Sequence, residues 1–304
     1  MLRALITAFA ALAGLAFGSF LNVCLSRWPE GESIVKPRSH CRNCGRTLTW
    51  WENIPLLSWL ALRGRCRTCK ATISWRYPLV EIVVAACWVK LASAPFPDIP
   101  SDDYAQVFLL YIFATRILSM AFIWLLIALA LLDAENLWLP DFLTLTGVVI
   151  GFLYAACEPA ILWKLDSLTQ IPLTEESEST PFGLFTPALS RLAGILAAAL
   201  LILAIRWVYW LLRHREGIGL GDAKLMAMLA AWLGLPGALL SFAIGVILGA
   251  IVGVIVLARG PREGAESPAL AKLPLGTFLS IGGIISSLWG QPIIAAYMRY
   301  AGLN

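Results

Sequence analysis

The chain has 304 residues, of which 59% are hydrophobic and 14% charged, and its formal net charge is +4. This composition excludes a disordered chain and a soluble nucleic-acid-binding protein. The apolar stretches are spread along the whole chain, which excludes a soluble domain with a single anchor. We therefore predict an all-α polytopic membrane protein, with membrane lipid as a partner and no nucleic acid.

About eight segments are apolar and approach the ~20 residues that cross a ~30 Å hydrocarbon core as a helix. The second and sixth are short, and the third is long and contains Arg116. The first ends without a small-residue cleavage site, so it is predicted as a span rather than a removed signal peptide. The eight segments are 5–25, 78–91, 105–132, 142–157, 187–212, 223–235, 236–258 and 276–297.

The segment 27–76 is strongly basic, with ten Lys or Arg residues against three Glu. The positive-inside rule places it in the cytoplasm. Alternation from there puts the acidic segments 95–104 and 158–186 outside, together with both chain ends. The external loop 158–187 is long and acidic, and its role stays open. The predicted organisation is a first transmembrane helix at 1–26, a cytoplasmic loop at 27–77 and a seven-helix membrane domain at 78–304.

Four of the seven cysteines form two CxxC pairs inside the basic loop. Two such pairs at this spacing are typical of a zinc ribbon, in which four thiolates surround one tetrahedral Zn²⁺. A closed set of four thiolates indicates a structural rather than a catalytic metal, and the adjacent His40 is predicted to be a bystander. The predicted metal ligands are Cys41, Cys44, Cys66 and Cys69.

Two aspartates stand next to predicted spans at the cytoplasmic side. Asp133 follows the third span, and Asp222 ends the run Gly217-Ile218-Gly219-Leu220-Gly221-Asp222. Ionisable groups at the membrane are costly and indicate function. Two close carboxylates would share a proton, so that one activates water while the other protonates the scissile carbonyl, as in aspartic proteases. The alternative is that each aspartate only stabilises a helix end.

Each of several other polar residues is open to two interpretations. Glu81 either binds substrate or cofactor or pairs with an arginine such as Arg76. Lys224 either tunes the aspartates or forms a salt bridge elsewhere. Arg116 and Arg206 either line a polar groove or reflect snorkelling or a helix break. The remaining expectations are a hydrogen bond between helices from Asn22, a solvated loop position for His214, and close helix packing at Gly14, Gly18, Gly245, Gly249 and Gly253.

In their order along the chain, these motifs resemble those of bacterial type IV prepilin peptidases, the leader peptidase/N-methyltransferases of the GxGD-type membrane aspartyl proteases. The C-terminal half carries the two aspartyl motifs and a last cytoplasmic motif. The N-terminal half carries the motifs around the cysteines. The matching segments are 18–23, 37–41, 52–55, 58–59, 62–66, 76–81, Asp133 with 139–141, 217–224 and 273–276.

The resemblance implies an inner-membrane enzyme that cleaves the basic leader of type IV prepilins or type II secretion pseudopilins after a glycine, on the cytoplasmic side. It implies Asp133 and Asp222 as the catalytic pair and leaves Asp141 as a polar neighbour. It also implies N-methylation of the new N-terminus with S-adenosylmethionine, associated with the four-cysteine loop at 27–77. The S-adenosylmethionine site and the oligomeric state, including a homo-oligomer, stay open. The alternatives are a peptidase without methylation, and a polytopic transporter or scaffold with a structural zinc ribbon.

Overall fold

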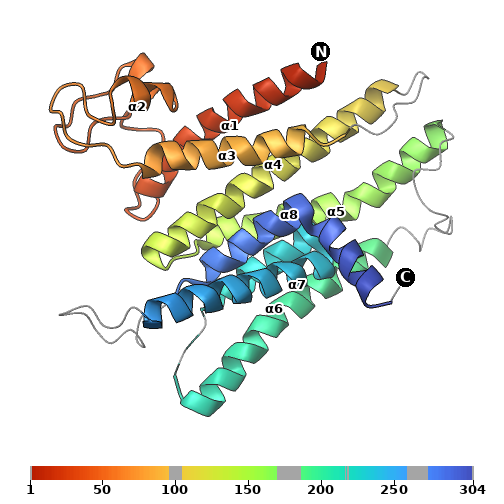
Figure 1. Ribbon diagram of the computed structural model, residues 1–304. Helices are drawn as coiled ribbons and strands as arrows, with labels where there is room; N and C mark the ends of the chain where they lie inside the picture. The colour runs from red at the N-terminus through yellow and green to blue at the C-terminus, as the bar shows by residue number, and fades with distance from the viewer. Residues whose placement is uncertain are drawn as a thin grey trace. The chain divides into compact units, whose positions relative to one another are not determined.

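The structure is a computed structural model that describes residues 2–95, 105–169, 186–215, 217, 219–258 and 273–302 (Figure 1). Helices dominate these residues, and strand pairing within them is limited to two isolated bridges. The all-α prediction is confirmed. The helices are α1 (Leu2–Arg27), the 3-10 helix η1 (Trp50–Asn53), α2 (Leu57–Ala61), α3 (Arg76–Ala92), α4 (Ala105–Asn136), α5 (Asp141–Thr169), α6 (Thr186–Arg213), α7 (Leu220–Ala258) and α8 (Leu275–Tyr300).

Six of these helices are long and apolar enough to cross a membrane, namely α1 and α4 to α8. The predicted multi-pass helical membrane protein is therefore confirmed. The second predicted span coincides with α3, whose 17 residues make a helix somewhat shorter than the ~30 Å hydrocarbon core at ~1.5 Å per residue. Helix α7 has 39 residues, about twice what one crossing needs, and covers the sixth and seventh predicted spans. The count of eight spans stays a prediction.

Helix α7 is divided at Gly234, whose φ of 71° and ψ of 172° are not helical. A positive φ favours glycine, because a side chain there would clash with the backbone. Pro236 follows inside the helix and has no N–H to donate to the preceding turn. The two residues therefore separate two helical segments, close to the boundary predicted between 223–235 and 236–258.

The loop predicted to begin at 158 begins later in the structure, because α5 continues to Thr169. Apolar residues continue at helical spacing through Ile161, Leu165 and Leu168, which explains the extension. The remainder of that acidic loop, at 170–185, lies outside the described residues. So do residues 259–272, between the seventh and eighth predicted spans.

The chain divides into two compact units. Unit 1 comprises Met1–Pro97 and Thr115–Trp124, and includes α1, η1, α2 and α3. Unit 2 comprises Asp98–Ala114 and Leu125–Asn304, and includes α5 to α8. Helix α4 contributes residues to both units. The four cysteines belong to unit 1, whereas both aspartates belong to unit 2.

In unit 1, α1 and α3 approach each other through glycines. A Cβ atom added at Gly14 or Gly18 would lie 2.6 Å from the Cα of Ala85 or Glu81, respectively. The predicted packing role of these two glycines is therefore confirmed. Close backbone approach of this kind is how helices associate where lipid supplies no hydrophobic driving force.

Because Gly18 meets backbone rather than a flexible side chain, Gly18→Val is expected to lower stability by ~1–3 kcal/mol, the usual cost of overpacking. The thermal unfolding midpoint in detergent measures this loss. Ala16→Val is the matched control, since Ala16 is exposed on the same helix. A midpoint that falls no further for Gly18→Val than for Ala16→Val would contradict this account of the α1–α3 contact.

Two polar side chains of unit 1 donate hydrogen bonds to backbone carbonyl groups of α3 and of the residues that follow it. Asn22 donates from Nδ2 to the Tyr77 carbonyl at 3.0 Å, which confirms the predicted hydrogen bond between helices. Arg116 donates to the carbonyls of Ala92, Ala94 and Pro95 at 3.0 to 3.1 Å. Carbonyls at the end of a helix lack intrahelical donors, so Arg116 stabilises the C-terminal end of α3. The position of Arg116 in a predicted span is therefore explained by the end of α3 that it contacts, rather than by a polar groove.

In unit 2, α7 and α8 pack backbone against backbone. A Cβ added at Gly245 would lie 3.1 Å from the Leu279 nitrogen, and one added at Gly282 would lie 2.2 Å from the Ser241 carbonyl oxygen. Gly249 and Gly253 instead face the side chains of Phe278 and Leu273, each 3.3 Å from an added Cβ, which confirms their predicted packing role. These contacts fix the first turn of α8 relative to α7. The largest fully buried side chains of this unit are Leu126, Leu129, Leu132, Ile202, Leu225, Met226, Met228 and Leu229.

Candidate active site and metal centre

The four predicted cysteines converge in unit 1, and their sulfur atoms all lie within 4.8 Å of one another. The Sγ atoms of Cys41 and Cys69 are 3.8 Å apart, close to the ~3.8 Å edge of a tetrahedron with Zn–S bonds of ~2.3 Å. None of the four forms a disulfide. The predicted cluster is confirmed, and it could hold one metal ion. We call residues 38–75, which contain it, the cysteine module.

Each CxxC pair forms the same backbone turn. Cys41 donates its N–H to the Arg46 carbonyl and accepts from the Gly45 N–H at its own carbonyl, and Cys66 does the same with Ala71 and Lys70. Gly45 and Lys70 both have positive φ, at 70° and 60°. The bridges His40 with Thr47 and Arg65 with Thr72 close the two turns. The module therefore uses one turn twice, with the two cysteine pairs facing each other.

The surroundings of the sulfur atoms lower the pKa of two of the four thiols and raise that of a third. The Ala71 N–H and then the Asn43 amide lower the pKa of the Cys69 thiol to about 6, and the N–H groups of Cys69 and Thr68 lower that of Cys66. At Cys44 the Arg46 N–H lowers the pKa, but burial and the neighbouring sulfurs together raise it to about 11. Four adjacent thiolates repel one another, so a cation between them favours the fully ionised set.

An ion pair with a buried carboxylate stabilises the segment between the two turns. Arg46 donates from Nη2 to Glu52 Oε1 at 2.5 Å, while the N–H and hydroxyl of Thr49 donate to Glu52 Oε2 at 2.8 and 2.7 Å. The hydrogen bond from Arg46, followed by those from Thr49, lowers the pKa of Glu52 from 4.5 to about 2. Glu52 itself is only 6% exposed.

Because the folded pKa of Glu52 lies below its unfolded value, its stabilising effect is fully present above about pH 4.5 and is lost as the pH falls toward about 2. Glu52→Gln is therefore expected to unfold at a lower temperature than wild type at pH 6, with a smaller difference at pH 3. Thermal scans of both proteins at the two pH values measure this. Glu32→Gln, at an exposed position, is the control. A wild-type advantage that is unchanged at pH 3 would contradict the assignment.

In unit 2, Asp133 lies in the last turn of α4 and is 6% exposed. Its Oδ2 accepts from the Thr277 N–H at 2.7 Å and from the Thr277 hydroxyl at 3.2 Å. Thr277 is in the first turn of α8, whose free N–H groups favour a negative charge. A carboxylate at the C-terminal end of its own helix is unfavourable, so Asp133 depends on α8 for its stabilisation.

Asp222 lies in the first turn of α7 and is 7% exposed. Its Oδ2 accepts from the Gly219 N–H at 3.1 Å. The carboxylates of Asp133 and Asp222 are close enough for their charges to interact. The structure therefore brings together the two aspartates that the sequence places 89 positions apart (222 minus 133), both buried and both beside a helix N-terminus.

Leu139 and two glycines lie next to this pair. A Cβ added at Gly276 would lie 2.8 Å from Leu139 Cδ1 and 3.0 Å from Asp133 Oδ2. A Cβ added at Gly221 would lie 3.0 Å from Leu139 Cβ. The loop before α5 and the first turns of α7 and α8 therefore meet at Leu139, beside Asp133.

Asp141 takes a different position. Its Oδ1 accepts from Lys224 Nζ at 2.6 Å, and the Asp141 side chain is 61% exposed. The salt bridge from Lys224 is thus to Asp141 at the surface. Of the three aspartates in the motifs, only Asp133 and Asp222 are buried.

Comparison with known proteins finds two family models that match separate parts of the chain. Residues 12–94 match the Bacterial Peptidase A24 N-terminal domain, and residues 177–254 match the Type IV leader peptidase family. A Prepilin leader peptidase/N-methyltransferase of Pseudomonas aeruginosa is 33% identical over 96% of this chain and 93% of its own length. The chain belongs to the type IV leader peptidase family.

Proteins of the same name from Burkholderia pseudomallei and Stutzerimonas stutzeri are 33% and 31% identical, over 94% and 97% of this chain and 86% and 94% of their own lengths. No solved structure matches the chain. The N-terminal family match contains all four cysteines, and the C-terminal one contains Asp222. Asp133 lies between the two matched regions, so its place beside Asp222 comes from the structure.

Three other predicted polar residues have partners of their own. Glu81 is buried in unit 1, where its Oε2 accepts from the Leu56 N–H at 2.6 Å and thereby ties the cysteine module to α3. His40 is hydrogen-bonded to the Arg38 carbonyl rather than placed among the sulfurs. His214 is exposed and its ring contacts that of Trp210.

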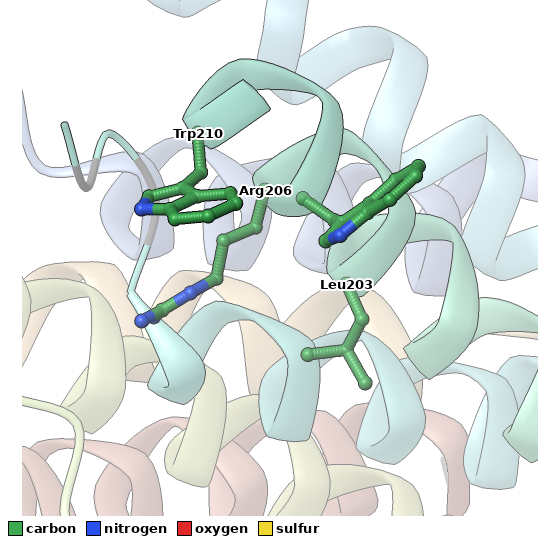
Figure 2. A pocket seen from close by; sticks show the side chains of 4 residues that line it. Leu203, Arg206 and Trp210 are labelled. Atoms are coloured by element: carbon green, nitrogen blue, oxygen red, sulfur yellow. The ribbon is translucent and has the colours of Figure 1, made fainter. Parts of the chain in front are cut away.

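Arg206 lines a surface pocket together with leucine and tryptophan side chains, rather than a groove of polar residues. Figure 2 shows its side chain running alongside the ring of Trp210. All four lining residues belong to α6, and no carboxylate is among them. This pocket is therefore separate from the aspartate pair. Its lining residues are Leu203, Arg206, Trp207 and Trp210.

Sequence reasoning missed three residues at these sites. Thr277 contacts Asp133 from a segment far away in the sequence, which no local pattern marks. Leu139 lies near Asp133 in the sequence, but only the motif Leu139-Pro140-Asp141 hinted that its side chain matters there. Asn43 donates to Cys69 Sγ at 3.5 Å. The shared pattern Cys-Arg-Xaa-Cys-Xaa-Xaa-Thr, at 41–47 and 66–72, could have predicted the repeated turn.

Proposed function

We propose that this protein removes the basic leader from type IV prepilins or type II secretion pseudopilins and then N-methylates the new N-terminal residue. The single observation that carries the peptidase half is the pair of buried aspartates, Asp133 beside the first turn of α8 and Asp222 in the first turn of α7. Membership of the type IV leader peptidase family supports both halves, because relatives of the same length are named for both activities.

The chemistry assigned to the aspartates is hydrolysis without a covalent intermediate. Two close carboxylates share one proton, so one of them removes a proton from water while the other donates its proton to the carbonyl oxygen of the scissile bond. The water oxygen then bonds to the carbonyl carbon, the C–N bond breaks, and the leaving amine takes a proton. The Thr277 N–H keeps the Asp133 carboxylate in position by a hydrogen bond, and the Gly219 N–H does so for Asp222.

We propose Zn²⁺ as the metal of the cysteine module. Four sulfur donors within 4.8 Å of one another suit Zn²⁺, and a closed set of four leaves no position for a substrate. Its role is therefore structural, holding Cys41 and Cys44 against Cys66 and Cys69. A module with two short helices and little buried apolar surface needs such an ion for its order.

Methylation is assigned to the part of the chain that contains the cysteine module. S-adenosylmethionine, when bound, supplies an electrophilic methyl group that a neutral amine attacks. The basic loop predicts that the module faces the cytoplasm. Both aspartates border the same side by alternation of the predicted spans, which is where the junction between a charged leader and an apolar helix would lie in an inner membrane.

The proposal is tested with the purified protein in liposomes and a prepilin that carries a basic leader, followed by intact-mass spectrometry. Without S-adenosylmethionine, the product is expected to lose the leader only. With it, the product is expected to gain one methyl group as well. Leader loss with no methyl gain would identify a peptidase alone. An uncleaved prepilin, with folded protein of full zinc content, would contradict the proposed function.

A further inference from the structure

The first part of α7 is a separate helical segment that carries Asp222. Residues 220–233 are helical, and the non-helical Gly234 ends the segment. Asp222 lies in its first turn and Trp232 near its end, about 15 Å further along at ~1.5 Å per residue. The hydrogen bond that Asp222 accepts comes from the loop just before α7, so it does not fix the segment relative to other helices. The distance between Asp222 and Asp133 therefore depends on where the segment is held.

Helix α5 contacts this segment through two glycines that are one helical turn apart. A Cβ atom added at Gly147 would overlap the sulfur of Met228, and one added at Gly151 would lie 2.5 Å from Trp232 Cδ1. Met228 and Trp232 are one helical turn apart as well, so they lie on one face of the segment. A methionine side chain adapts to its surroundings, whereas an indole ring is rigid. Trp232 is therefore the contact that opposes sliding of the segment along α5.

The Trp232 ring is held on three sides by α5. Its Nε1 donates to the Gly147 carbonyl at 2.8 Å. The ring is stacked on that of Tyr154, with centroids 5.9 Å apart and planes at 26° to each other. Gly151 closes the third side, because a Cβ atom there would lie 2.5 to 3.0 Å from three atoms of the ring. A shift of the ring would break the hydrogen bond or bring the ring against backbone, so these contacts favour one position of the segment on α5.

Near Asp222 the link between the segment and α5 is weaker. It is the salt bridge of Lys224 with Asp141, whose side chains are 33% and 61% exposed, and exposed salt bridges contribute little. We propose that Trp232 is a positioning residue for the peptidase reaction, whose contacts with α5 set the distance between the carboxylates of Asp222 and Asp133. This inference rests on the proposed peptidase function.

The test is a double-mutant cycle of Gly151→Ala and Trp232→Leu, with kcat and KM measured for leader removal from a prepilin in liposomes. The added methyl group would displace the indole ring, and a displacement of ~1 Å can cost ~10²-fold in rate. Gly151→Ala is therefore expected to lower kcat by ~10²-fold with KM nearly unchanged. In the Trp232→Leu background there is no indole ring to displace, so Gly151→Ala should lower kcat by no more than ~2-fold further.

Trp232→Phe keeps an aromatic ring but cannot donate to the Gly147 carbonyl, so it should lower kcat by less than Gly151→Ala does. It keeps the test decisive if Trp232→Leu loses its fold. Gly194→Ala is the matched control, because a Cβ atom there would make an ordinary contact with Leu235 at 3.4 Å, beyond the break in α7. It should leave kcat at the wild-type value. Thermal midpoints near that of wild type would separate a displaced aspartate from a general loss of fold.

An equal loss of kcat from Gly151→Ala in the wild-type and Trp232→Leu backgrounds would overturn this inference and leave the peptidase function intact. Wild-type kcat in both Gly151→Ala and Trp232→Phe, or a loss that appears only in KM, would overturn it as well. A wild-type protein that does not cleave the prepilin would instead refute the proposed function.

Discussion

Asp133→Asn and Asp222→Asn are each expected to slow leader cleavage by ~10²- to 10⁴-fold, the usual effect of losing a general acid or base. The amide has the size of the carboxyl group but cannot remove a proton from water. Both residues are buried, and each accepts a hydrogen bond at the first turn of a helix. Cleavage rates of a prepilin in liposomes, at matched zinc content and thermal midpoint, measure the loss.

Asp141→Asn is the matched control for the two aspartate variants. Asp141 belongs to the same sequence motif as Leu139, but its side chain is 61% exposed and pairs with Lys224. Surface salt bridges contribute ~0–1 kcal/mol, so we expect only a small change in rate. If Asp141→Asn loses cleavage while Asp133→Asn keeps it, then Asp133 only stabilises the first turn of α8 and the catalytic assignment is wrong.

Removal of the metal is expected to unfold the cysteine module and abolish methylation while leader cleavage continues. Zinc binding contributes ~10–16 kcal/mol to the folding of small zinc-finger peptides, more than a module of this size can replace. The aspartates belong to unit 2, whereas the four sulfur atoms belong to unit 1. Chelator treatment or Cys66→Ser should therefore make residues 38–75 sensitive to limited proteolysis.

The two activities are assayed separately, with methylation measured on a pilin that already lacks its leader. Cys157→Ser is the control, because Cys157 is an exposed cysteine outside the cluster. It should retain both one zinc ion per chain and methylation. Full methylation by a zinc-free protein would contradict the structural role proposed for the metal.

Much of this arrangement follows from local sequence patterns. Paired CxxC motifs predicted the sulfur cluster because a turn of this kind depends on adjacent residues. The glycines at 14 and 18 predicted close helix packing because their spacing places both on one face of a helix. Pro236 marked the division of α7 because it cannot donate to the preceding turn.

The parts that could not be predicted depend on contacts between distant segments. Thr277 contacts Asp133 from another helix, and no local pattern marks either as the other's partner. Arg116 was open to two interpretations because its role is set by the end of α3, which the sequence does not place beside it. Nothing in the sequence distinguishes Leu139 from the other leucines. Only the structure shows that its side chain lies against Gly221 and Gly276.

The most direct test of the central claim is to locate the scissile bond on the enzyme. A prepilin with a photo-crosslinking residue two positions on the leader side of the cleavage site is bound to Asp222→Asn in liposomes, which keeps the substrate uncleaved. After illumination, mass spectrometry of the peptides identifies the enzyme residues joined to it. The account predicts crosslinks within 133–141, 217–224 or 273–277. Crosslinks confined to the cysteine module or to the Arg206 pocket of α6 would contradict it.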